Sequence, residues 1–535
     1  VGRFELASGN WVQNTAPLPS FAATDFRLTG GSFLRAAGGA GTGADPYRLT
    51  DIYGVQGMGS SPAWRAASYR LANNIAAAGT SGWNGGAGFV PVGTNAAPFT
   101  GSLDGAGYVI NGLTINRQTM NDVGLIGVAG SGSSISNLGL VGGSVRGQDS
   151  VGGLVGVNFG TITQAYATGA VTGRNFVGGL VGANLGGITQ AYATGAVTGT
   201  GGNVGGLVGG NSPGSSIMQA YATGAVEGSD NVGGLVGFND GSITEAYATT
   251  GAVTGTGGNV GGLVGGNLLG TVENSFWFKP ADGSRNSLDN GVGTGLDEAA
   301  MRDPASFTGW DLSSTWNLQN APRPFLRYWQ QSLTATVANV TTTYTGNNFA
   351  GTPGISYSVS GFVPETAPVF DYNGGGAPRN AGTYTINACC LLSTQQYAAT
   401  VVPGTLTINA APLTITGGTT TSTYTANAQT NTSALTVAGL LGSDSVTGVN
   451  GRASGTNVGT YSDALSGATG TGLGNYTISY VNGGLIINAA PLTITGGTTT
   501  ATYTAAAQTN SFTTSGLLGS DSVTGVSGRA TGTNV

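Results

Sequence analysis

The chain of 535 residues contains no histidine, which excludes several classes of active site. Without an imidazole there is no Ser-His-Asp or Cys-His catalytic unit, no histidine general base and no histidine-ligated zinc. Two cysteines are too few for a disulfide scaffold, a four-cysteine zinc site or an iron–sulfur cluster. Lys279 is the single lysine, so P-loop or Schiff-base chemistry would depend on it alone. We therefore expect no catalytic residue, no metal ligand and no cofactor.

Charge is also scarce, with 17 basic and 23 acidic side chains and a net charge of −6. The arginines are scattered and form no basic stripe, so we expect no nucleic-acid partner. Apolar runs such as Val151–Gly156 are short and interrupted by glycine, so we expect no membrane insertion. The opening residues Val1–Glu5 lack the pattern of a signal peptide, and the first residue is not Met. We expect the sequence to be part of a longer chain.

The missing charge is replaced by small and β-branched residues, including 99 glycines. Intrinsic disorder usually combines high charge with few apolar residues, whereas 39% of this chain is hydrophobic. Glycine has no three-residue period, which excludes collagen. Short runs of Val and Thr between glycines indicate many short strands joined by tight turns. The composition predicts an all-β protein.

A repeat of 26–28 residues occupies residues 120–277. Its Gly-Gly-Leu-Val-Gly core recurs at Leu154, Leu180, Leu207, Leu235 and Leu263. Three short β segments per repeat with glycine corners predict one coil of a right-handed parallel β-helix, with coils about 4.8 Å apart. The stretches at 47–53, 69–75 and 99–110 read as degenerate coils, so we place the whole solenoid at residues 1–277, with degenerate coils over 1–119.

Equivalent residues of stacked coils should form ladders along the solenoid axis. The predicted ladder positions are an isoleucine and an aromatic residue from each coil: Ile162, Tyr166, Ile188, Tyr192, Ile217, Tyr221, Ile243, Tyr247, Val272 and Phe276. A polar ladder is predicted between them, at Gln164, Gln190, Gln219, Glu245 and Asn274. Whether the tyrosines point inward stays open, because Ile162, Gln164 and Tyr166 share a face only in an unkinked strand.

Residues 278–331 break the repeat, and we interpret them as a cap on the open end of the solenoid plus a connector. The aromatic residues Trp83, Phe89, Trp310, Trp316, Tyr328 and Trp329 could form a sugar-stacking platform. We favour the alternative that they plug the ends of the solenoid.

A second repeat of 77–80 residues begins near Leu333. Leu413-Thr-Ile-Thr-Gly-Gly returns from Leu492, and a diverged earlier copy aligns Tyr344 with Tyr424. Alternating Thr, Val, Ile and Tyr between glycine turns predict small antiparallel β modules in tandem. We place them at residues 332–410, 411–489 and 490–535, the last of them truncated.

The motifs resemble those of a known family. Residues 1–331 resemble filamentous-haemagglutinin-like adhesins, the exoproteins of Gram-negative two-partner secretion systems. The similarity lies in Phe4–Trp11, Phe33–Gly39, Ser81–Phe89 and the Gly-Gly-Leu-Val-Gly-x-Asn…Ala-Tyr-Ala-Thr-Gly coils, which are similar to GLUG repeats. The modules after residue 332 resemble MBG-type repeats. The resemblance implies export through an outer-membrane pore and a role in adhesion, aggregation and biofilm matrix. The family's amino-terminal secretion domain is not present among these residues.

Three further groups of residues are candidate sites. Adjacent Cys389 and Cys390 could close a disulfide, although two buried thiols in a strand are the simpler interpretation. The acids Glu227, Asp230, Asp240 and Glu245 could bind calcium, although solvated turn residues explain them better. The acids of residues 282–311 could bind calcium or act as a carboxylate pair on a glycoside, but a connector would not fix their separation.

The sequence favours a structural function over an enzymatic one. The leading hypothesis is a secreted or cell-surface adhesin and biofilm-matrix protein whose partner is a glycan or a cell-surface receptor. The alternative is a self-assembling filament or sheath protein whose partners are copies of itself, because low charge reduces the repulsion between copies. A polysaccharide-active β-helix enzyme is a distant third, since no carboxylate cluster lies on one face of stacked coils.

Overall fold

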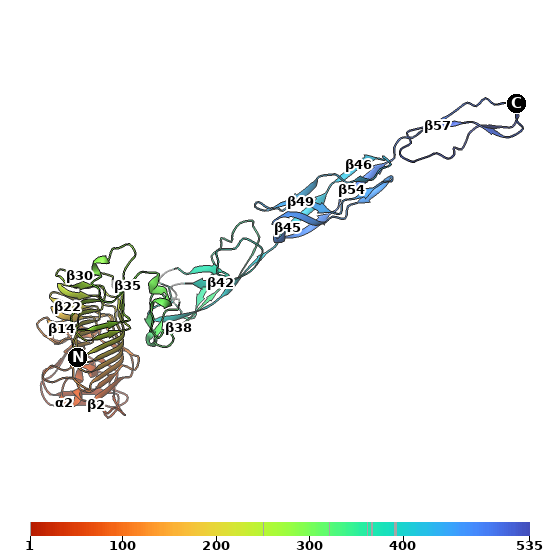
Figure 1. Cartoon of the computed structure of the whole chain (residues 1–535). Coiled ribbons are helices and arrows are strands. Elements are labelled where there is room, and N and C mark those ends of the chain that lie inside the picture. The colour runs from red at the N-terminus through yellow and green to blue at the C-terminus, as the bar shows by residue number, and fades with distance from the viewer. Residues whose placement is uncertain are drawn as a thin grey trace. The chain divides into compact units, whose positions relative to one another are not determined.

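The computed structural model describes residues 2–249, 251–319, 321–360, 362–364, 367–389 and 393–534. Contacts between Cα atoms divide the chain into two units. The first unit consists of residues 1–333 with 364–366 and 390–399, and the second contains the remaining residues. The first unit is a parallel β-helix and the second consists of short β-sheets (Figure 1), which confirms the predicted all-β fold.

Three sheets of the β-helix contain six, six and five strands, each strand from a different coil and paired in parallel with that of the next coil. The first contains β11 (Ile126–Ala129), β15 (Val155–Asn158), β19 (Val181–Asn184), β23 (Val208–Asn211), β27 (Val236–Asn239) and β32 (Val264–Asn267). The second contains β10 (Thr114–Asn116), β13 (Ser144–Arg146), β17 (Ala170–Gly173), β21 (Val197–Gly199), β25 (Val226–Gly228) and β30 (Val253–Gly255). The third contains β14 (Asp149–Gly152), β18 (Asn175–Gly178), β22 (Gly202–Gly205), β26 (Asp230–Gly233) and β31 (Val260–Gly261).

A fourth sheet of 14 strands extends along the solenoid and contains the predicted ladder residues. Its regular strands are β12 (Ser134–Val141), β16 (Thr161–Ala167), β20 (Gly187–Ala193), β24 (Ser216–Ala222), β28 (Ser242–Thr244), β29 (Tyr247–Ala248), β33 (Thr271–Glu273), β34 (Phe276–Phe278) and β35 (Thr294–Leu296). Its strands from the degenerate coils are β5 (Tyr47–Leu49), β6 (Ser68–Leu71), β7 (Ile75–Ala76), β8 (Ser102–Asp104) and β9 (Val109–Asn111).

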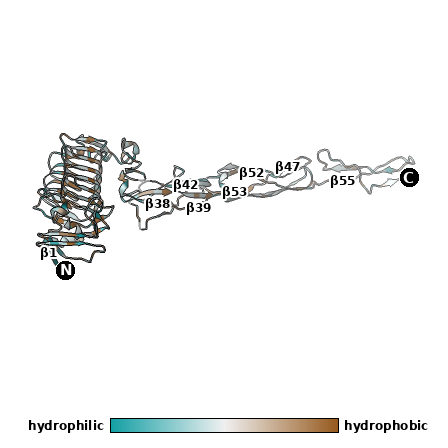
Figure 2. Cartoon of the chain, turned by 90° about the horizontal axis from the view of Figure 1, so that it is seen from below, coloured by the Kyte–Doolittle hydropathy of each residue, from teal (hydrophilic) through white to brown (hydrophobic). Residues whose placement is uncertain are grey.

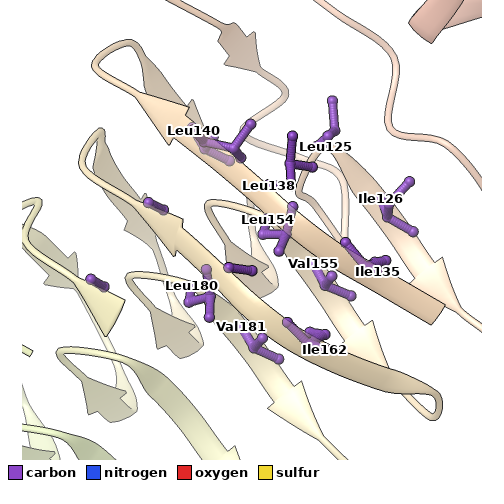
Figure 3. Packing of buried hydrophobic residues seen from close by; sticks show 14 of the residues in the cluster. Leu125, Ile126, Ile135, Leu138, Leu140, Leu154, Val155, Ile162, Leu180 and Val181 are labelled. Atoms are coloured by element: carbon purple, nitrogen blue, oxygen red, sulfur yellow. The ribbon is translucent and has the colours of Figure 1, made fainter. Parts of the chain in front are cut away.

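Identical residues stack on each other inside the coils. Val155 pairs with Val181, and Ile162 with Ile188, so the interior is filled by files of leucine, valine and isoleucine (Figure 3). Hydrophobic residues recur along the stacked strands in Figure 2. Glycine at the corners is a steric requirement, because a Cβ on Gly178 would lie 2.1 Å from the carbonyl oxygen of Val181. The Gly-Gly-Leu-Val-Gly motif thus combines core residues with a close approach of neighbouring backbones.

The first coils depart from the predicted run of strands. Strands β1 (Arg3–Leu6) and β3 (Asp25–Leu28) pair in parallel, as do β2 (Asn10–Asn14) and β4 (Ser32–Ala36). The stretch at 47–53 was expected to be a strand, but it is one only over β5. Helix α1 (Ile52–Gly57) follows because the Asp51 carboxylate accepts a hydrogen bond from the Gly54 amide at 3.0 Å, which caps the helix.

Two more helical segments, α2 (Pro62–Arg65) and η1 (Ala78–Gly86), complete this part of the chain. Trp83 and Phe89 are fully buried there beside Phe26. These aromatic residues therefore belong to the interior core of the first coils, where neither can stack on a sugar.

Residues 278–331 fold into two parts. Strand β35 pairs with β34, and Leu288 and Val292 contact the interior core, so residues 278–296 form a last partial coil. Residues 297–329 contain the hairpin β36 (Trp316–Asn317) and β37 (Phe325–Leu326) with short 3-10 turns. Those turns are η3 (Ala300–Arg302), η4 (Pro304–Ser306) and η5 (Arg327–Trp329), while η2 (Asn286–Leu288) belongs to the partial coil.

The first two modules share one topology; the second lies wholly in the second unit and the first lies mostly in it. The first contains β38 (Gln331–Val337), β39 (Val340–Thr343), β40 (Ile355–Tyr357), β41 (Val369–Tyr372), β42 (Gly382–Cys389), β43 (Tyr397–Val402) and β44 (Gly404–Asn409). The second contains β45 (Ala411–Gly417), β46 (Thr419–Thr423), β47 (Gln429–Thr430), β48 (Leu435–Ala438), β49 (Ser445–Asn450), β50 (Ser454–Gly455), β51 (Gly459–Ser462), β52 (Ser466–Thr471), η6 (Leu473–Asn475), β53 (Tyr476–Val481) and β54 (Gly484–Asn488). The orders β40-β38-β43 and β48-β45-β53 are equivalent.

The prediction of purely antiparallel modules is wrong. Strand β39 is parallel to β44, and β46 is parallel to β54 in the same relative position. Strand β45 lies between antiparallel β48 and parallel β53.

The third module contains β55 (Thr493–Gly496), β56 (Gln508–Thr509), β57 (Phe512–Ser515) and β58 (Thr531–Gly532). Among the residues that the structure describes, β55 pairs with β57 alone, and Ile494 is 42% exposed where its equivalent Ile415 is fully buried.

Candidate functional site: the ladders and outer faces of the β-helix

One backbone kink in each coil decides which way the ladder residues point. Gln164 has a φ of 51°, and Gln190, Gln219, Glu245 and Asn274 occupy the same left-handed region. The strand therefore turns a corner at this residue, and the alternation of faces is reset. The residue two positions before the kink points into the core, whereas the residue two positions after it points outward.

The isoleucine file lies inside the solenoid. Ile162, Ile188, Ile217 and Ile243 pair in register and are at most 1% exposed, and Val272 continues the file with partial burial. Each side chain thus contacts its copy in the next coil, which buries almost all of its apolar surface.

The tyrosine file lies on the outside of the same sheet. Tyr166, Tyr192, Tyr221 and Tyr247 stack with ring centroids 4.6, 4.8 and 5.0 Å apart and planes within 11° of parallel, and Phe276 pairs next in register. Tyr221 and Tyr247 are nevertheless almost completely buried. Burial raises the pKa of both hydroxyls, because the charged phenolate would be desolvated there.

Residues 297–319 and 321–329, here called the cover segment, bury this outward file. Their aromatic side chains pack on the tyrosine rings, and the ring centroids of Trp310 and Trp316 are 4.4 Å apart. The Trp310 indole N–H donates to the Asn274 carbonyl at 2.8 Å, and the Tyr247 hydroxyl donates to the Pro324 carbonyl at 2.5 Å. The expectation that these tryptophans plug the end of the solenoid is therefore wrong, since they cover its side.

The cover segment also excludes the sugar-stacking alternative for its buried tryptophans. Trp316 is fully buried and Trp310 is 7% exposed, so neither ring face is open to a ligand. Trp329 packs edge-on against Tyr166 at 4.6 Å, whereas Tyr328 is 46% exposed.

Ladders of side-chain amides accompany the apolar files. Gln164 donates to Gln190 at 2.8 Å, Gln190 to Gln219 at 3.2 Å, and Gln219 to the Glu245 carboxylate at 3.0 Å. This ladder occupies the first four of the five predicted polar positions and ends on Glu245, the single charged residue of the file.

The second amide ladder was not predicted. Asn158, Asn184, Asn211, Asn239 and Asn267 form a continuous chain of side-chain hydrogen bonds of 2.8–2.9 Å, and the first four are buried. The signal was present in the sequence, because each Gly-Gly-Leu-Val-Gly motif is followed by one variable residue and then an asparagine. Buried amides need partners, and in-register stacking supplies them.

The acidic candidates act as local hydrogen-bond acceptors. Asp230 accepts from the Asn259 amide and Asp240 from the Leu269 amide, each in the next coil. In the 282–311 region, Asp289 pairs with Lys279 at 2.7 Å and Asp311 accepts from the Ser313 and Ser314 amides. Over the described ranges, no three Cys, Asp or Glu side chains are grouped as a metal site would require.

The cysteine pair cannot be assigned. The backbone of Cys389 ends strand β42, but its side chain and the whole of Cys390 lie outside the described residues. The disulfide therefore stays a prediction.

In the parts of the chain that the structure describes, no helix has both the length and the apolarity to cross a bilayer.

Comparison with known proteins identifies the repeat. The GLUG motif family matches residues 147–172. Halomucin of Haloquadratum walsbyi is 35% identical over 161 residues, which are 29% of this chain and 2% of that protein. A protein of Evansella cellulosilytica, provisionally named a Gly-rich membrane protein, is 44% identical over 81 residues, or 15% of this chain and 9% of its own length. The chain thus spans a small fraction of these relatives.

Among solved structures, a Bacteroides ovatus protein, provisionally named an immunoglobulin A1 protease, aligns with a TM-score of 0.42 and 20% identity. The alignment covers 55% of this chain and 95% of that one.

Proposed function

We propose that this protein is an extracellular or cell-surface structural adhesin that mediates attachment through its repeat-built β-helix. The observation that carries the proposal is the in-register stacking of outward-facing positions that stay at least partly exposed, namely Thr163, Thr189, Met218 and Thr244, which repeats one outer surface along the axis. A repeated surface favours multivalent contact with a repetitive partner such as a glycan or a layer of receptors. The relative named as a membrane protein supports a surface location.

A non-enzymatic role is part of this proposal. The chain lacks histidine, and the carboxylates of the 282–311 region act in turns and ion pairs. Export through an outer-membrane pore and a Gram-negative origin rest only on the resemblance of the motifs to two-partner secretion exoproteins.

A self-assembling filament is the second candidate. Among the described residues, β1 pairs only with β3 and β2 only with β4, so each has a second edge able to accept a strand. The low charge of the chain would weaken repulsion between copies.

Electron microscopy and light scattering at rising protein concentration separate the two candidates. Particles of constant mass, together with saturable binding of the purified chain to bacterial or host cells, would support the adhesin. Ordered fibres or a mass that grows with concentration would instead support the filament. A chain that stays monomeric and binds no cell surface would contradict both.

A further inference from the structure

A small cavity opens where the cover segment meets the last coils of the β-helix. Its volume is about 280 Å³, and its lining includes Thr249, Phe278, Arg285, Glu298, Met301 and Arg323. All of these residues belong to the first unit. Cavities that bind organic ligands start near 300 Å³, so the space suits one small ring and not a larger molecule.

Two guanidinium groups reach this cavity from different segments. Arg323 lies in the loop that joins β36 to β37, and its Nη1 donates to the Thr249 hydroxyl at 2.8 Å. Arg285 lies over the Phe278 ring, with its guanidinium carbon 5.4 Å from the ring centroid, and donates to the Gly251 carbonyl. A guanidinium has five N–H donors, so Arg323 retains donors beyond its bond to Thr249.

The charge of Arg323 is not neutralised within the described part of the chain, where no carboxylate lies within ion-pair distance of it. Glu298, the acid at the cavity, already pairs with Arg302. Arg323 is half-buried, and its positive charge extends to the nearby Tyr221 and Tyr247 hydroxyls, where it opposes the rise in their pKa. A half-buried guanidinium without a carboxylate is stabilised by an anion, and most strongly by a planar one that accepts two N–H bonds.

The remaining walls are apolar. Met301 is 2% exposed, and Phe278 and Pro322 are half-buried beside it. A ligand that fills the cavity therefore needs a carboxylate on one side, C–H groups on the other, and hydroxyls for the Thr249 side chain and the backbone. A sugar acid has these features in one ring.

We propose that the Arg285–Arg323 cavity binds the carboxylate of a single acidic sugar residue, such as a uronic acid displayed on a polysaccharide. This inference rests on the proposed adhesive function and specifies its ligand class. Arg323 forms the bidentate contact, Arg285 adds the second charge, and the Phe278–Met301 wall excludes water from the ion pair.

Titration of the full chain with glucuronic acid tests the proposal, with glucose as the matched neutral sugar and inorganic sulfate as an anion without a ring. We expect saturable binding of glucuronic acid by calorimetry, with glucose and sulfate at least about tenfold weaker. Arg323→Gln should lose about tenfold in affinity, and Arg323→Lys should lose less because it keeps the charge. Arg146→Gln, which removes an exposed arginine from β13, should bind like the wild type.

Equal binding of glucuronic acid and glucose, or equal binding by wild type and Arg323→Gln, would overturn the proposal. Sulfate binding as tight as glucuronic acid would also overturn it, because the site would then recognise any anion. If Arg323→Gln does not fold, Arg323→Lys and the salt dependence of binding by the wild type decide the matter. A wild-type chain that attaches to cells but does not bind glucuronic acid would refute this site alone. A wild-type chain that does neither would refute the adhesive function as well.

Discussion

The ring of Tyr192 lies 4.8 Å from the ring of Tyr221, with the two planes 9° from parallel. This separation is close to the distance between adjacent strands, so the rings repeat with the backbone that holds them. Each ring face is covered by the neighbouring coil, and the outer edges are covered by residues 297–329. The tyrosine file is thus a second, exterior core built on the outside of the solenoid.

Tyr192→Asp should destabilise the β-helix by about 3 kcal/mol or more, because a carboxylate would be buried between two rings without a partner. Chemical denaturation followed by tryptophan fluorescence measures this directly, since all seven tryptophans lie in the first unit. Tyr328→Asp is the matched control, because Tyr328 is 46% exposed and should tolerate the charge. An unchanged unfolding midpoint for Tyr192→Asp would show that the file faces solvent.

The same burial predicts a loss of stability in alkaline solution. Desolvation raises the pKa of Tyr192, Tyr221 and Tyr247 in the folded state, whereas the unfolded tyrosines titrate near the ordinary value of about 10. The unfolded chain therefore releases these protons first, and stability that is complete below pH 10 falls as the pH rises above it. Melting temperatures between pH 9 and 12 should decline less steeply for Tyr221→Phe than for the wild type. Identical slopes would contradict the assigned burial.

The sequence alone was sufficient to predict the parallel β-helix, because a repeat of 26–28 residues with three β segments leaves little choice of architecture. It could not orient Tyr166, since the left-handed conformation of Gln164 that reverses the face is not determined by residue type. The sequence also led us to place Trp310 and Trp316 at the end of the solenoid. They instead pack on the outward tyrosine file, and the alternation of residues along the strand could not show that this file points outward.

Glu245→Gln should stabilise the β-helix slightly, by about 0.5 kcal/mol. The Gln219 amide would still find an oxygen acceptor, while the desolvation of a half-buried charge would be removed. Glu227→Gln is the control, because this acid is exposed on the outer side of β25 and should have little effect. A midpoint at or below that of the wild type would argue against a stabilising role for this amide ladder.

Asn211→Ala should cost about 2–3 kcal/mol, because it removes the central member of the buried asparagine ladder. Asn184 would lose its acceptor and Asn239 its donor, and neither side chain is open to water. Asn259→Ala serves as the comparison, since the exposed Asn259 side chain ends a third, shorter amide ladder. It donates to Asn231 at 2.9 Å, and Asn231 donates to Asn203 at 2.8 Å. Equal destabilisation by both variants would mean that burial of the ladder contributes nothing.

In the second unit, one carboxylate joins the first two modules. Asp444 accepts hydrogen bonds from the Tyr344 hydroxyl at 2.7 Å and the Tyr476 hydroxyl at 2.9 Å, and pairs with Arg379 at 3.3 Å. These contacts, the Tyr344 bond foremost, hold the pKa of Asp444 below its ordinary value. The ionised form is therefore favoured by folding, and its contribution is complete above about pH 4 and lost as the pH falls through the folded pKa.

Asp444→Asn should weaken this junction by about 2 kcal/mol at neutral pH, because hydrogen bonds to a charged acceptor become neutral ones. Hydrogen exchange by mass spectrometry should show faster exchange of the Leu441 amide, which donates to the Tyr476 hydroxyl at 2.8 Å. The wild type should approach the exchange rate of the variant on acidification below pH 4, once intrinsic exchange is corrected for. Asp371→Asn, which changes a turn acceptor elsewhere in the first module, should leave the Leu441 region unchanged. Exchange at Leu441 that responds equally to both substitutions would mean that Asp444 does not hold the modules together.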